Sequence, residues 1–389
     1  MNVKKSPEDQ EHTLKVGILG CGAISDTYCK GLSNSPHVRL VACADRNADA
    51  ARALAENHGL RAMSIQEMLV SPEIDIIVNL TPPIVHAEIG LQILRAGKHL
   101  FQEKPLATNI SDARALIAEA ERLHLRIGCA SDTFLGASHQ ACRAEIDAGA
   151  IGEVIGGSVQ VYSDGMESWH PNPRFFFEPG GGPILDLGPY YVTQLVHLLG
   201  PVAEVVAMGR IGRTTRTIGS GPNKGNSFAV QVPTTIYAVL RFQNGAVINF
   251  SASWDAIAHQ DGQSLELFGT EGCLVGPSPN FFDGRVQVCN SSSSWNDVNT
   301  ERWAFGKANY ELPHGERVAY HRGLGVIEMA ASIKAGRPHR ANAELAFHVL
   351  EVLVAIERAA EGGQLQRIST TVERPIPLPH GHDQTVFGN

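Results

Sequence analysis

The chain lacks several features that would assign a protein to a class at sight. Its seven cysteines are an odd number, scattered without C-x-x-C pairs or zinc-site spacings, so neither a disulfide framework nor a bound metal is indicated. Acidic and basic residues are interspersed and the net charge is −8, so nothing predicts nucleic acid or an anionic membrane as a partner. No apolar run approaches the roughly 18 residues that a membrane-spanning helix needs.

A secretion signal is also missing from the start of the sequence. Met1 to His12 are charged and polar and contain no apolar core of a signal peptide. We therefore expect a flexible arm over residues 1–13 and a cytoplasmic location. The 389 residues, 43% apolar and 19% charged and without internal repeats, predict a globular protein of two or three domains.

A glycine-rich turn carries the first functional signal. Val16 to Leu19 form a short apolar run that predicts a buried parallel strand. Gly20 allows a tight turn, and Gly22 lets the backbone approach a phosphate. The helical pattern from Ala23 onward would direct its N-terminal N–H groups at a pyrophosphate. Ser25 stands where the third glycine of G-x-G-x-x-G is usual, and an ordinary strand–turn–helix is the weaker alternative.

Asp45 gives that turn the context of a dinucleotide site. A second apolar strand, Arg39 to Ala44, ends at this aspartate, about twenty residues after the glycines, where a carboxylate hydrogen-bonds the adenosine ribose of NAD. A carboxylate also repels the 2′-phosphate of NADP, whereas Arg46 beside it would soften that preference. The sequence therefore predicts NAD as the cofactor and leaves NADP open.

Strand and helix patterns alternate through the first third of the chain. This alternation predicts a doubly wound parallel sheet, a Rossmann dinucleotide-binding domain over residues 14–135, with ligands at the carboxyl ends of its strands. Further strands are expected at residues 74–80, 99–102 and 126–130, and helices at residues 48–58 and 83–96 and after Asn109 or Ser111.

Beyond residue 135 the pattern changes to strands joined by turns, so the fold class is α/β plus α+β. Gln243-Asn244-Gly245 is a strong hairpin signal. We expect residues 136–389 to form an α/β substrate and oligomerisation domain with a large, mostly antiparallel open sheet. Strands are expected at residues 154–162, 202–211, 234–242, 246–253 and 264–268, helices at residues 324–335 and 343–361, and polar loops at residues 210–227 and 290–315.

Two turns at strand ends of the first domain carry polar groups. Thr81-Pro82 would lie under a bound cofactor, and an ordinary strand-to-helix turn is an equal alternative. In Glu103-Lys104-Pro105 the lysine precedes a proline, so it takes extended or turn geometry, and the Lys104–Pro105 bond is a candidate for the cis form. Beside a nicotinamide, Lys104 would stabilise an alkoxide as hydride leaves its carbon; a solvated Lys–Glu pair is the alternative.

A third motif lies in the second domain, where the glycines and proline of residues 180–183 lead into a helix. Asp186 and Tyr190 are four residues apart and can share one helix face. An acid–base pair with that spacing would handle the proton of a hydroxyl group. Without further context, a helix N-cap and a packed ring are the better interpretations of the two residues.

Together these stretches resemble one family, the Gfo/Idh/MocA oxidoreductases, over about residues 14–361. The resemblance implies that Lys104 is catalytic and that Asp186 matches the aspartate of the family's second motif. The family's usual histidine four residues later is Tyr190 here. A phenol serves as acid or base when an ammonium group lies beside it, so we favour Tyr190 for the proton and His170, the other candidate, for contact with substrate.

The substrate side is marked by fewer residues. An aromatic ring with neighbouring hydrogen-bond donors suits a sugar, so Trp169, His170 and Arg174 are expected at the substrate. His321, just before a later helix, is a further candidate, with a solvated surface group as the alternative.

Two other stretches favour structure over function. Phe175-Phe176-Phe177 reads as core. Arg210, Arg213 and Arg216 would meet an anionic group on a substrate or a neighbouring subunit, but a solvated loop is favoured for them.

The sequence as a whole predicts an NAD(P)-dependent dehydrogenase acting on a ring hydroxyl of a sugar, sugar derivative or cyclic polyol. The main alternative is an NAD-dependent glycosidase that retains its cofactor and cleaves by transient oxidation and elimination; the other is a cofactor-sensing binding protein. An open sheet also predicts a homo-oligomer, either a dimer or a tetramer. The expected catalytic residues are Lys104, Asp186, Tyr190 and His170. The expected cofactor contacts are Gly20, Cys21, Gly22, Ala23, Ile24, Asp45, Arg46, Thr81, Pro82, His86, Glu103 and Lys104. The expected substrate contacts are Lys104, Trp169, His170, Arg174, Asp186, Tyr190 and His321.

Overall fold

The structure is a computed structural model that describes residues 13–33, 35–258, 264–290, 294–311 and 315–387. Of the arm expected over residues 1–13, all but Thr13 lies outside the described residues. The chain divides into two compact units. The first contains the described chain up to Asp132, His321–Ala346 and the segment from Gly381, and the second contains Thr133–Tyr320 and Phe347–His380. The predicted domain boundary at residue 135 stays a prediction.

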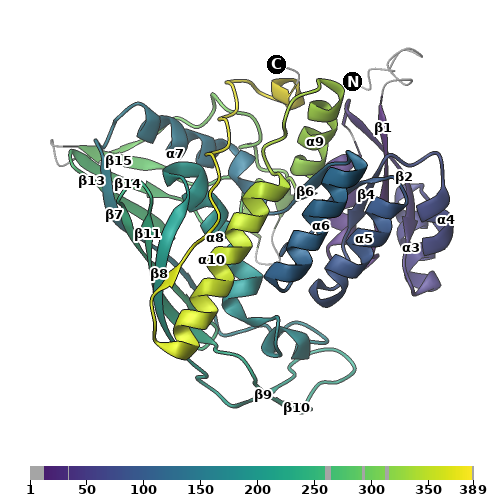
Figure 1. Cartoon of the computed structure of the whole chain (residues 1–389), viewed down its shortest axis with the longest axis horizontal. Helices are drawn as coiled ribbons and strands as arrows, with labels where there is room; N and C mark the ends of the chain where they lie inside the picture. Colours follow the sequence, from purple (N-terminus) through teal and green to yellow (C-terminus); the bar gives the residue numbers. More distant parts are fainter. Residues whose placement is uncertain (1–12, 34, 259–263, 291–293, 312–314, 388–389) are drawn as a thin grey trace. The chain divides into compact units, whose positions relative to one another are not determined.

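The first unit is a Rossmann fold, as the sequence predicts. Its described strands all pair in parallel, in the order β3-β2-β1-β4-β5-β6. Figure 1 labels β1, β2, β4 and β6 of this sheet. Because the chain order reverses between β1 and β4, the carboxyl ends of these strands form the switch point at which such sheets bind ligands. The strands are β1 (Leu14–Leu19), β2 (Val38–Ala44), β3 (Arg61–Met63), β4 (Ile76–Asn79), β5 (His99–Gln102) and β6 (Ile127–Cys129).

Side-chain caps mark the start of α3, α4 and α6 in this unit. Asn47 and Asn109 accept backbone N–H groups from the first turns of α3 and α6, and Ser64 and Glu67 form a reciprocal capping box at α4. Each cap contributes about 1 kcal/mol to stability. The helices are α2 (Ser25–Leu32), α3 (Ala48–His58), α4 (Ile65–Val70), α5 (His86–Arg95), α6 (Ile110–Leu123) and α9 (Leu324–Lys334), with a 3-10 turn η1 (Pro83–Val85) before α5 and η4 (Gln384–Phe387) near the end.

The second unit is built on one large mixed sheet. Among its described strands the order is β16-β15-β14-β13-β7-β12-β11-β8-β19, and neighbours are antiparallel except for β7 and β12. This confirms the predicted mostly antiparallel sheet. Its strands are β7 (Val154–Tyr162), β8 (Val202–Arg210), β11 (Thr235–Phe242), β12 (Val247–Ser253), β13 (Leu265–Gly269), β14 (Gly272–Gly276), β15 (Gln287–Asn290), β16 (Trp295–Asp297) and β19 (Gln366–Arg367). Two small separate pairs are β9 (Thr215–Thr217) with β10 (Ser227–Ala229) and β17 (Tyr310–Glu311) with β18 (Arg317–Val318).

Strand β11 shows how the sheet distinguishes its two faces. Ile236 and Phe242 are buried, whereas Tyr237 between them is 55% exposed. Burying each large apolar side chain contributes about 1.5–3 kcal/mol, so the alternation of residue types selects the face that meets the helices. The predicted hairpin after β11 is confirmed: Gly245 takes a φ of 95°, and Asn244 Oδ1 accepts the N–H of Ala246.

Helices cover the buried face of this sheet. They are α7 (Ala137–Asp147), α8 (Gly182–Leu199) and α10 (Ala343–Gly362), with the short turns η2 (Thr133–Leu135) and η3 (Arg174–Phe177) before α7 and α8. Leu353 of α10 packs on Gly188 of α8, where an added Cβ would lie 2.6 Å from the leucine. The glycine therefore permits the close approach of the two helices. Within the described residues, no helix has both the length and the apolar character needed to span a bilayer.

Candidate active site

The glycine-rich turn packs against the turn that follows β4. Gly20 has a φ of 103°, and a Cβ there would lie 2.7 Å from the carbonyl carbon of Leu80. Gly22 differs, since a Cβ would meet no protein atom within 4 Å. The protein's own packing therefore requires glycine at residue 20 but not at residue 22. An open cradle at the N-terminus of α2 fits a phosphate group that must approach the backbone closely.

Asp45 at the end of β2 is tied to the same turn. Its Oδ2 accepts the N–H of Cys21 at 2.8 Å, and its Oδ1 accepts the N–H of Asn47 at 2.7 Å. The carboxylate is half-buried, while Arg46 beside it is exposed. Two backbone donors thus fix the carboxylate at the strand end, where an adenosine ribose would lie.

Buried amides join the carboxyl ends of β4 and β5. Asn79 Nδ2 donates to Gln102 Oε1 at 3.0 Å, and Gln102 Nε2 donates to the carbonyl of Leu106 at 3.1 Å. The hydroxyl of Thr81 donates to Asn79 Oδ1 at 2.7 Å. Thr81 is half-buried and Pro82 is exposed. The Thr81 hydroxyl, predicted to lie near the cofactor, therefore uses its proton in the bond to Asn79. Its oxygen lone pairs can still accept a hydrogen bond.

His86 connects the two predicted turns of this unit. Its Nε2 lies 2.7 Å from the carbonyl of Thr81 and its Nδ1 lies 2.8 Å from the carbonyl of Pro105. The ring is 1% exposed, and burial lowers the pKa of His86 although both carbonyls act in the opposite direction. Since both nitrogens contact backbone, the structure gives His86 a positioning role, and its predicted contact with cofactor stays a prediction.

Glu103 holds the backbone of the predicted catalytic lysine. Its Oε2 accepts the N–H of Lys104 at 2.8 Å, and its Oε1 accepts the hydroxyl of Tyr28, a buried residue of α2, at 2.8 Å. Burial raises the pKa of Tyr28, so the phenol stays a donor. The Lys104–Pro105 bond is cis, as the sequence suggested, and the lysine is half-buried.

Asp132 adds a second buried carboxylate to this unit. It follows β6, its Oδ2 accepts the N–H of Gly325 at 2.8 Å, and burial raises its pKa to about 6 while the charge of Arg322 acts in the opposite direction. His321, predicted as a substrate contact, lies one residue before Arg322 and so belongs to the first unit.

In the second unit, Asp186 and Tyr190 both lie on α8. The helix is capped by Gly181 and not by Asp186, so the N-cap interpretation of the aspartate is wrong. Asp186 is half-buried, whereas Tyr190 is 5% exposed. Pro183 occupies the first turn, where its missing N–H costs no helical hydrogen bond. The spacing of one turn expected from the sequence is therefore present.

The structure assigns a protonation pattern to His170. Its Nδ1 accepts the N–H of Asn172 at 3.1 Å, which leaves the ring proton of the neutral form on Nε2. Burial lowers the pKa of His170, and the charge of Asp186 acts on it in the opposite direction. A neutral ring with its proton on Nε2 donates a hydrogen bond, which suits contact with a substrate oxygen better than removal of a proton.

Aromatic rings surround His170. Trp169, Phe175 and Phe176 contact it edge-on, with ring centroids 5.4, 5.6 and 5.2 Å away. Trp169 is 60% exposed and Phe175 is 41% exposed, whereas Phe177 is fully buried. The core interpretation of the three phenylalanines therefore holds for Phe177 and is wrong for Phe175. Arg174 is exposed and lies 3.5 Å from Glu178.

The solvated loop predicted around Arg216 is wrong. The guanidinium is fully buried and forms ion pairs with Glu167 and Asp255, the latter at 2.7 Å. Arg213 is half-buried in the same network, and Arg210 is exposed. Both acidic partners lie about forty or more residues away in sequence, so local composition gave no sign of the pairing.

Comparison with known proteins identifies two stretches of the chain. Residues 14–131 match an oxidoreductase family with an NAD-binding Rossmann fold, and residues 139–275 match the GFO/IDH/MocA C-terminal domain. The chain belongs to the Gfo/Idh/MocA oxidoreductase family. Its first unit is an NAD-binding Rossmann domain, which confirms the predicted class of enzyme and its cofactor.

Two curated relatives give the range of this likeness. The chain is 28% identical over 266 residues to 1,5-anhydro-D-fructose reductase of Ensifer adhaerens, covering 67% of this chain and 74% of the relative. It is 24% identical over 262 residues to myo-inositol 2-dehydrogenase of Thermotoga maritima, covering 67% and 74%.

Solved structures share the fold of this family member. Levoglucosan dehydrogenase in complex with NADH and L-sorbose aligns with a TM-score of 0.76 at 20% identity, over 92% of this chain and 99% of that one. The WlbA dehydrogenase of Bordetella pertussis, in complex with NADH and UDP-GlcNAcA, aligns with a TM-score of 0.71 at 20% identity, over 91% and 98%. At this identity the likeness establishes the fold alone.

Proposed function

We propose that this oxidoreductase transfers a hydride between NAD and a ring hydroxyl of a sugar, sugar derivative or cyclic polyol. The names of the curated relatives, a reductase of an anhydro sugar and an inositol dehydrogenase, support this substrate class. The observation that carries it is the donor on His170 Nε2 beside the exposed ring of Trp169. An apolar ring face next to a hydrogen-bond donor complements a saccharide, whose ring has apolar faces and hydroxyl edges.

The residues of the first unit would hold the cofactor. Gly22, Ala23 and Ile24 present the open N-terminus of α2 to the pyrophosphate, and Asp45 accepts from the adenosine ribose. Thr81 and Pro82 at the end of β4 would lie against the nicotinamide half. Bound NAD supplies the hydride acceptor.

The proposed chemistry of the protein groups is a proton transfer and the stabilisation of a charge. Tyr190, as the phenolate, takes the proton of the substrate hydroxyl as hydride departs to NAD, and the Lys104 ammonium stabilises the developing alkoxide. Asp186, one turn before Tyr190 on α8, orients the reacting groups. Tyr190 is preferred to His170 for the proton because the neutral His170 ring is fixed as a donor.

The first test follows reduced nicotinamide when the protein meets NAD and a panel of sugars, inositols and methyl glycosides. Steady accumulation of NADH supports the proposal. Free sugar released from a glycoside without NADH accumulation indicates the glycosidase alternative, with a retained cofactor. If no member of the panel is turned over although NADH still binds, the proposal is overturned. The cofactor-sensing binding protein then becomes the favoured alternative.

Variants then assign the groups. Lys104→Ala is expected to lower kcat about a hundredfold or more with little change in NADH affinity, because it removes the charge that stabilises the alkoxide. Tyr190→Phe should lower kcat similarly while keeping the ring in place. Lys30→Ala, at an exposed pair on α2, is the matched control. Normal turnover of Lys104→Ala would exclude its assigned role.

The open face of the large sheet supports an oligomer. Met208 lies opposite Tyr237, and Val206 lies opposite Val239, with exposed fractions of 78%, 55%, 41% and 41%. Contiguous apolar side chains on a sheet face favour burial against another protein surface, here a second copy of the chain. Sedimentation of Met208→Glu should show smaller particles than the wild type. Ile257→Glu, 75% exposed beyond the end of β12, is the control, and equal sedimentation of both variants and wild type would contradict this assembly.

A further inference from the structure

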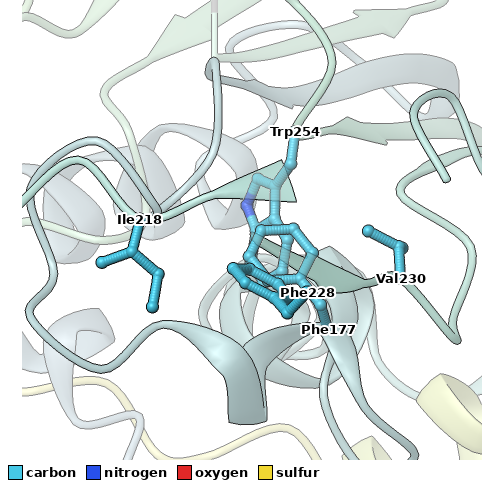
Figure 2. Packing of buried hydrophobic residues seen from close by; sticks show 5 residues of the cluster. All are labelled: Phe177, Ile218, Phe228, Val230 and Trp254. Carbon is cyan, nitrogen blue, oxygen red and sulfur yellow. The ribbon is translucent and has the colours of Figure 1, made fainter. Parts of the chain in front are cut away.

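Residues Ile211–Val232, part of the segment between β8 and β11, leave the large sheet and fold back beside the residues that follow β7. We call this stretch the excursion; it contains the small antiparallel pair β9 and β10. Its interior is apolar (Figure 2): Ile218, Phe228 and Val230 cluster with Phe177 and Trp254, which are both fully buried. Leu187, next to Asp186 on α8, packs against this cluster. The excursion therefore packs through a shared apolar core against Phe177 and Trp254.

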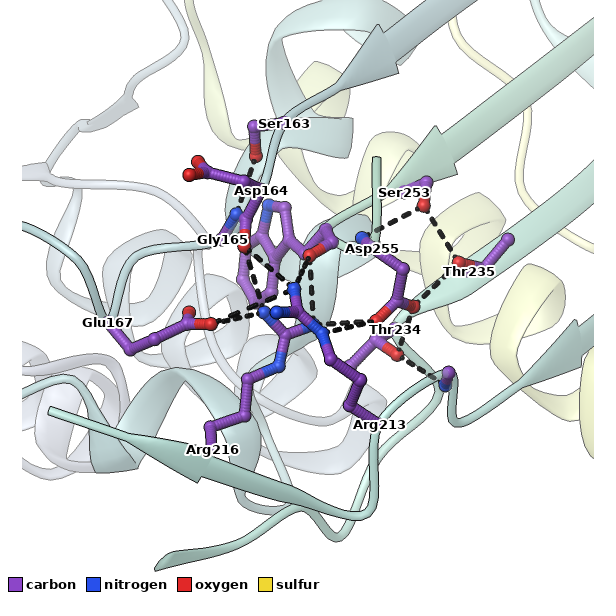
Figure 3. A network of polar contacts seen from close by, with 12 residues as sticks. Ser163, Asp164, Gly165, Glu167, Arg213, Arg216, Thr234, Thr235, Ser253 and Asp255 are labelled. Carbon is purple, nitrogen blue, oxygen red and sulfur yellow. Dashed lines mark hydrogen bonds and ion pairs between the residues drawn. The ribbon is translucent and has the colours of Figure 1, made fainter. Parts of the chain in front are cut away.

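Arg216 of the excursion binds the start of the turn that carries Trp169 and His170 (Figure 3). Its guanidinium donates to the carbonyl of Asp164 at 2.9 Å and forms an ion pair with Glu167. It also donates to the carbonyl of Trp254 at 2.8 Å and to Asp255 Oδ1 at 2.7 Å.

Asp255 is itself held in place. Its Oδ2 accepts the hydroxyls of Thr234 at 2.6 Å and of Thr235 at 2.7 Å. Arg216, a buried arginine with planar, fixed donors, thus joins Asp255 to the start of the turn that carries Trp169 and His170. A buried charge is stable only with such partners.

The tip of the excursion also binds the same turn, through two backbone carbonyls. Gly219 N donates to the carbonyl of Glu167 at 2.7 Å, and Ser220 Oγ donates to the carbonyl of Trp169 at 2.7 Å. A Cβ on Gly219 would lie 2.7 Å from the carbonyl oxygen of Ser168. The excursion therefore binds the backbone of the turn at the carbonyls of Glu167 and Trp169, while the ring of Trp169 stays 60% exposed.

We infer that the excursion positions Trp169 and His170 and so sets which sugar the enzyme accepts, with Arg216 and Ser220 as positioning residues. The turn's own bonds near these residues run from the N–H groups of Trp169 and His170 to the carbonyl of Met166. The excursion instead donates hydrogen bonds to backbone carbonyls of the turn, those of Glu167 and Trp169. This inference rests on the proposed function for its substrate class, whereas the contacts themselves do not depend on it.

Ser220→Ala and Gly219→Ala test the inference in the full-length protein. Ser220→Ala removes one hydrogen bond and should raise KM for the sugar about threefold to tenfold, with kcat and NADH affinity changed less. Gly219→Ala displaces the carbonyl of Ser168 and should raise KM further. Both should change the ratio of kcat/KM between two sugars that differ at one ring position. The control is Ser227→Ala, whose hydroxyl contacts Thr217 at 3.0 Å on the exposed side of the same hairpin.

Hydrogen exchange separates this inference from the proposed function. Amides of residues 166–170 should exchange faster in Ser220→Ala and Gly219→Ala than in Ser227→Ala, whether or not a sugar is turned over. If exchange is faster in these two variants but the wild type turns over no sugar, the positioning contact is supported and the proposed substrate class is ruled out. Arg216→Lys, which retains the charge but not the planar fork, should show the same direction of change. Unchanged exchange and unchanged KM in Ser220→Ala and Gly219→Ala would overturn the inference.

Discussion

The hydroxyl of Tyr28 lies 2.8 Å from Oε1 of Glu103, 75 residues later in the chain. The other oxygen of that carboxylate accepts the N–H of Lys104 at 2.8 Å. Helix α2, which starts at the glycine-rich turn, is thereby coupled through one carboxylate to the backbone of the proposed catalytic lysine. Tyr28 is fully buried and Glu103 is 8% exposed, so water cannot readily replace the phenol as a donor.

Tyr28→Phe should therefore lower stability and turnover together. Removing the donor leaves a buried carboxylate oxygen short of a partner, which should reduce the free energy of unfolding by about 1.5–3 kcal/mol. Displacement of Glu103 should also reduce kcat. Urea unfolding and steady-state kinetics measure the two effects. Tyr162→Phe, whose hydroxyl lies 2.7 Å from Ser251 in the second unit, is the control; an equal loss of kcat in both variants would contradict a specific coupling to Lys104.

The two glycines of the nucleotide turn should respond in opposite ways to alanine. Gly22→Ala introduces a Cβ into open space, so stability should change little while NADH affinity falls, because the methyl group occupies the place of a phosphate. Gly20→Ala places a Cβ 2.7 Å from Leu80 at a φ of 103° and should destabilise the fold by about 1 kcal/mol or more. Thermal unfolding with and without NADH distinguishes them. If Gly22→Ala binds NADH as tightly as the wild type, the pyrophosphate does not lie against Gly22.

Asp45 should set the preference for NAD over NADP. Asp45→Asn can still accept the N–H of Cys21 through its amide oxygen, but it loses the charge that repels a 2′-phosphate. NADH affinity should fall about tenfold, because a hydrogen bond to a charged acceptor is replaced by a neutral one, and NADPH affinity should not fall. Fluorescence titration gives both constants. Asp49→Asn, an exposed residue of α3, is the control. A parallel loss of NADH and NADPH affinity would argue against the role assigned to the charge.

Local patterns in the sequence predicted the elements that position the first half of the site. The apolar runs of β1, β2 and β5 and the turns at Gly20 and Lys104 each depend on neighbours in the chain, so the sequence reveals them directly. β3, at Arg61–Met63, was missed because three residues are too short to show a period.

Contacts between distant residues could not be predicted in the same way. From the sequence alone Tyr28 looks like an ordinary core ring, but in the structure its hydroxyl bonds Glu103. In the same way Arg216 looks like a solvated loop residue, but in the structure it pairs with Glu167 and Asp255. A charged side chain that would prefer water becomes buried when charged partners from distant parts of the chain surround it. The composition of a local stretch of sequence cannot show such partners.

His348 on α10 should make stability depend on pH. Its Nε2 accepts the N–H of Val202 at 3.0 Å, so the ring proton lies on Nδ1, which donates to Thr370 Oγ1 at 2.8 Å. Burial lowers the pKa of His348 from 6.5 to about 4. The neutral ring therefore stabilises the fold fully above pH 6.5, and this contribution is lost as the pH falls towards about 4, since only the unfolded chain takes up the proton in that interval.

His348→Gln tests this dependence by difference. Between pH 7 and about 4 the wild type should lose about 3 kcal/mol more unfolding free energy than the variant, the equivalent of its pKa displacement. His139, whose pKa burial also lowers to about 4, is present in both proteins, so its contribution cancels in the difference. Urea unfolding at successive pH values gives the two curves, with His382→Gln, at an exposed histidine, as the control. Parallel curves for wild type and His348→Gln would show that the ring is protonated in the folded protein as readily as in the unfolded chain.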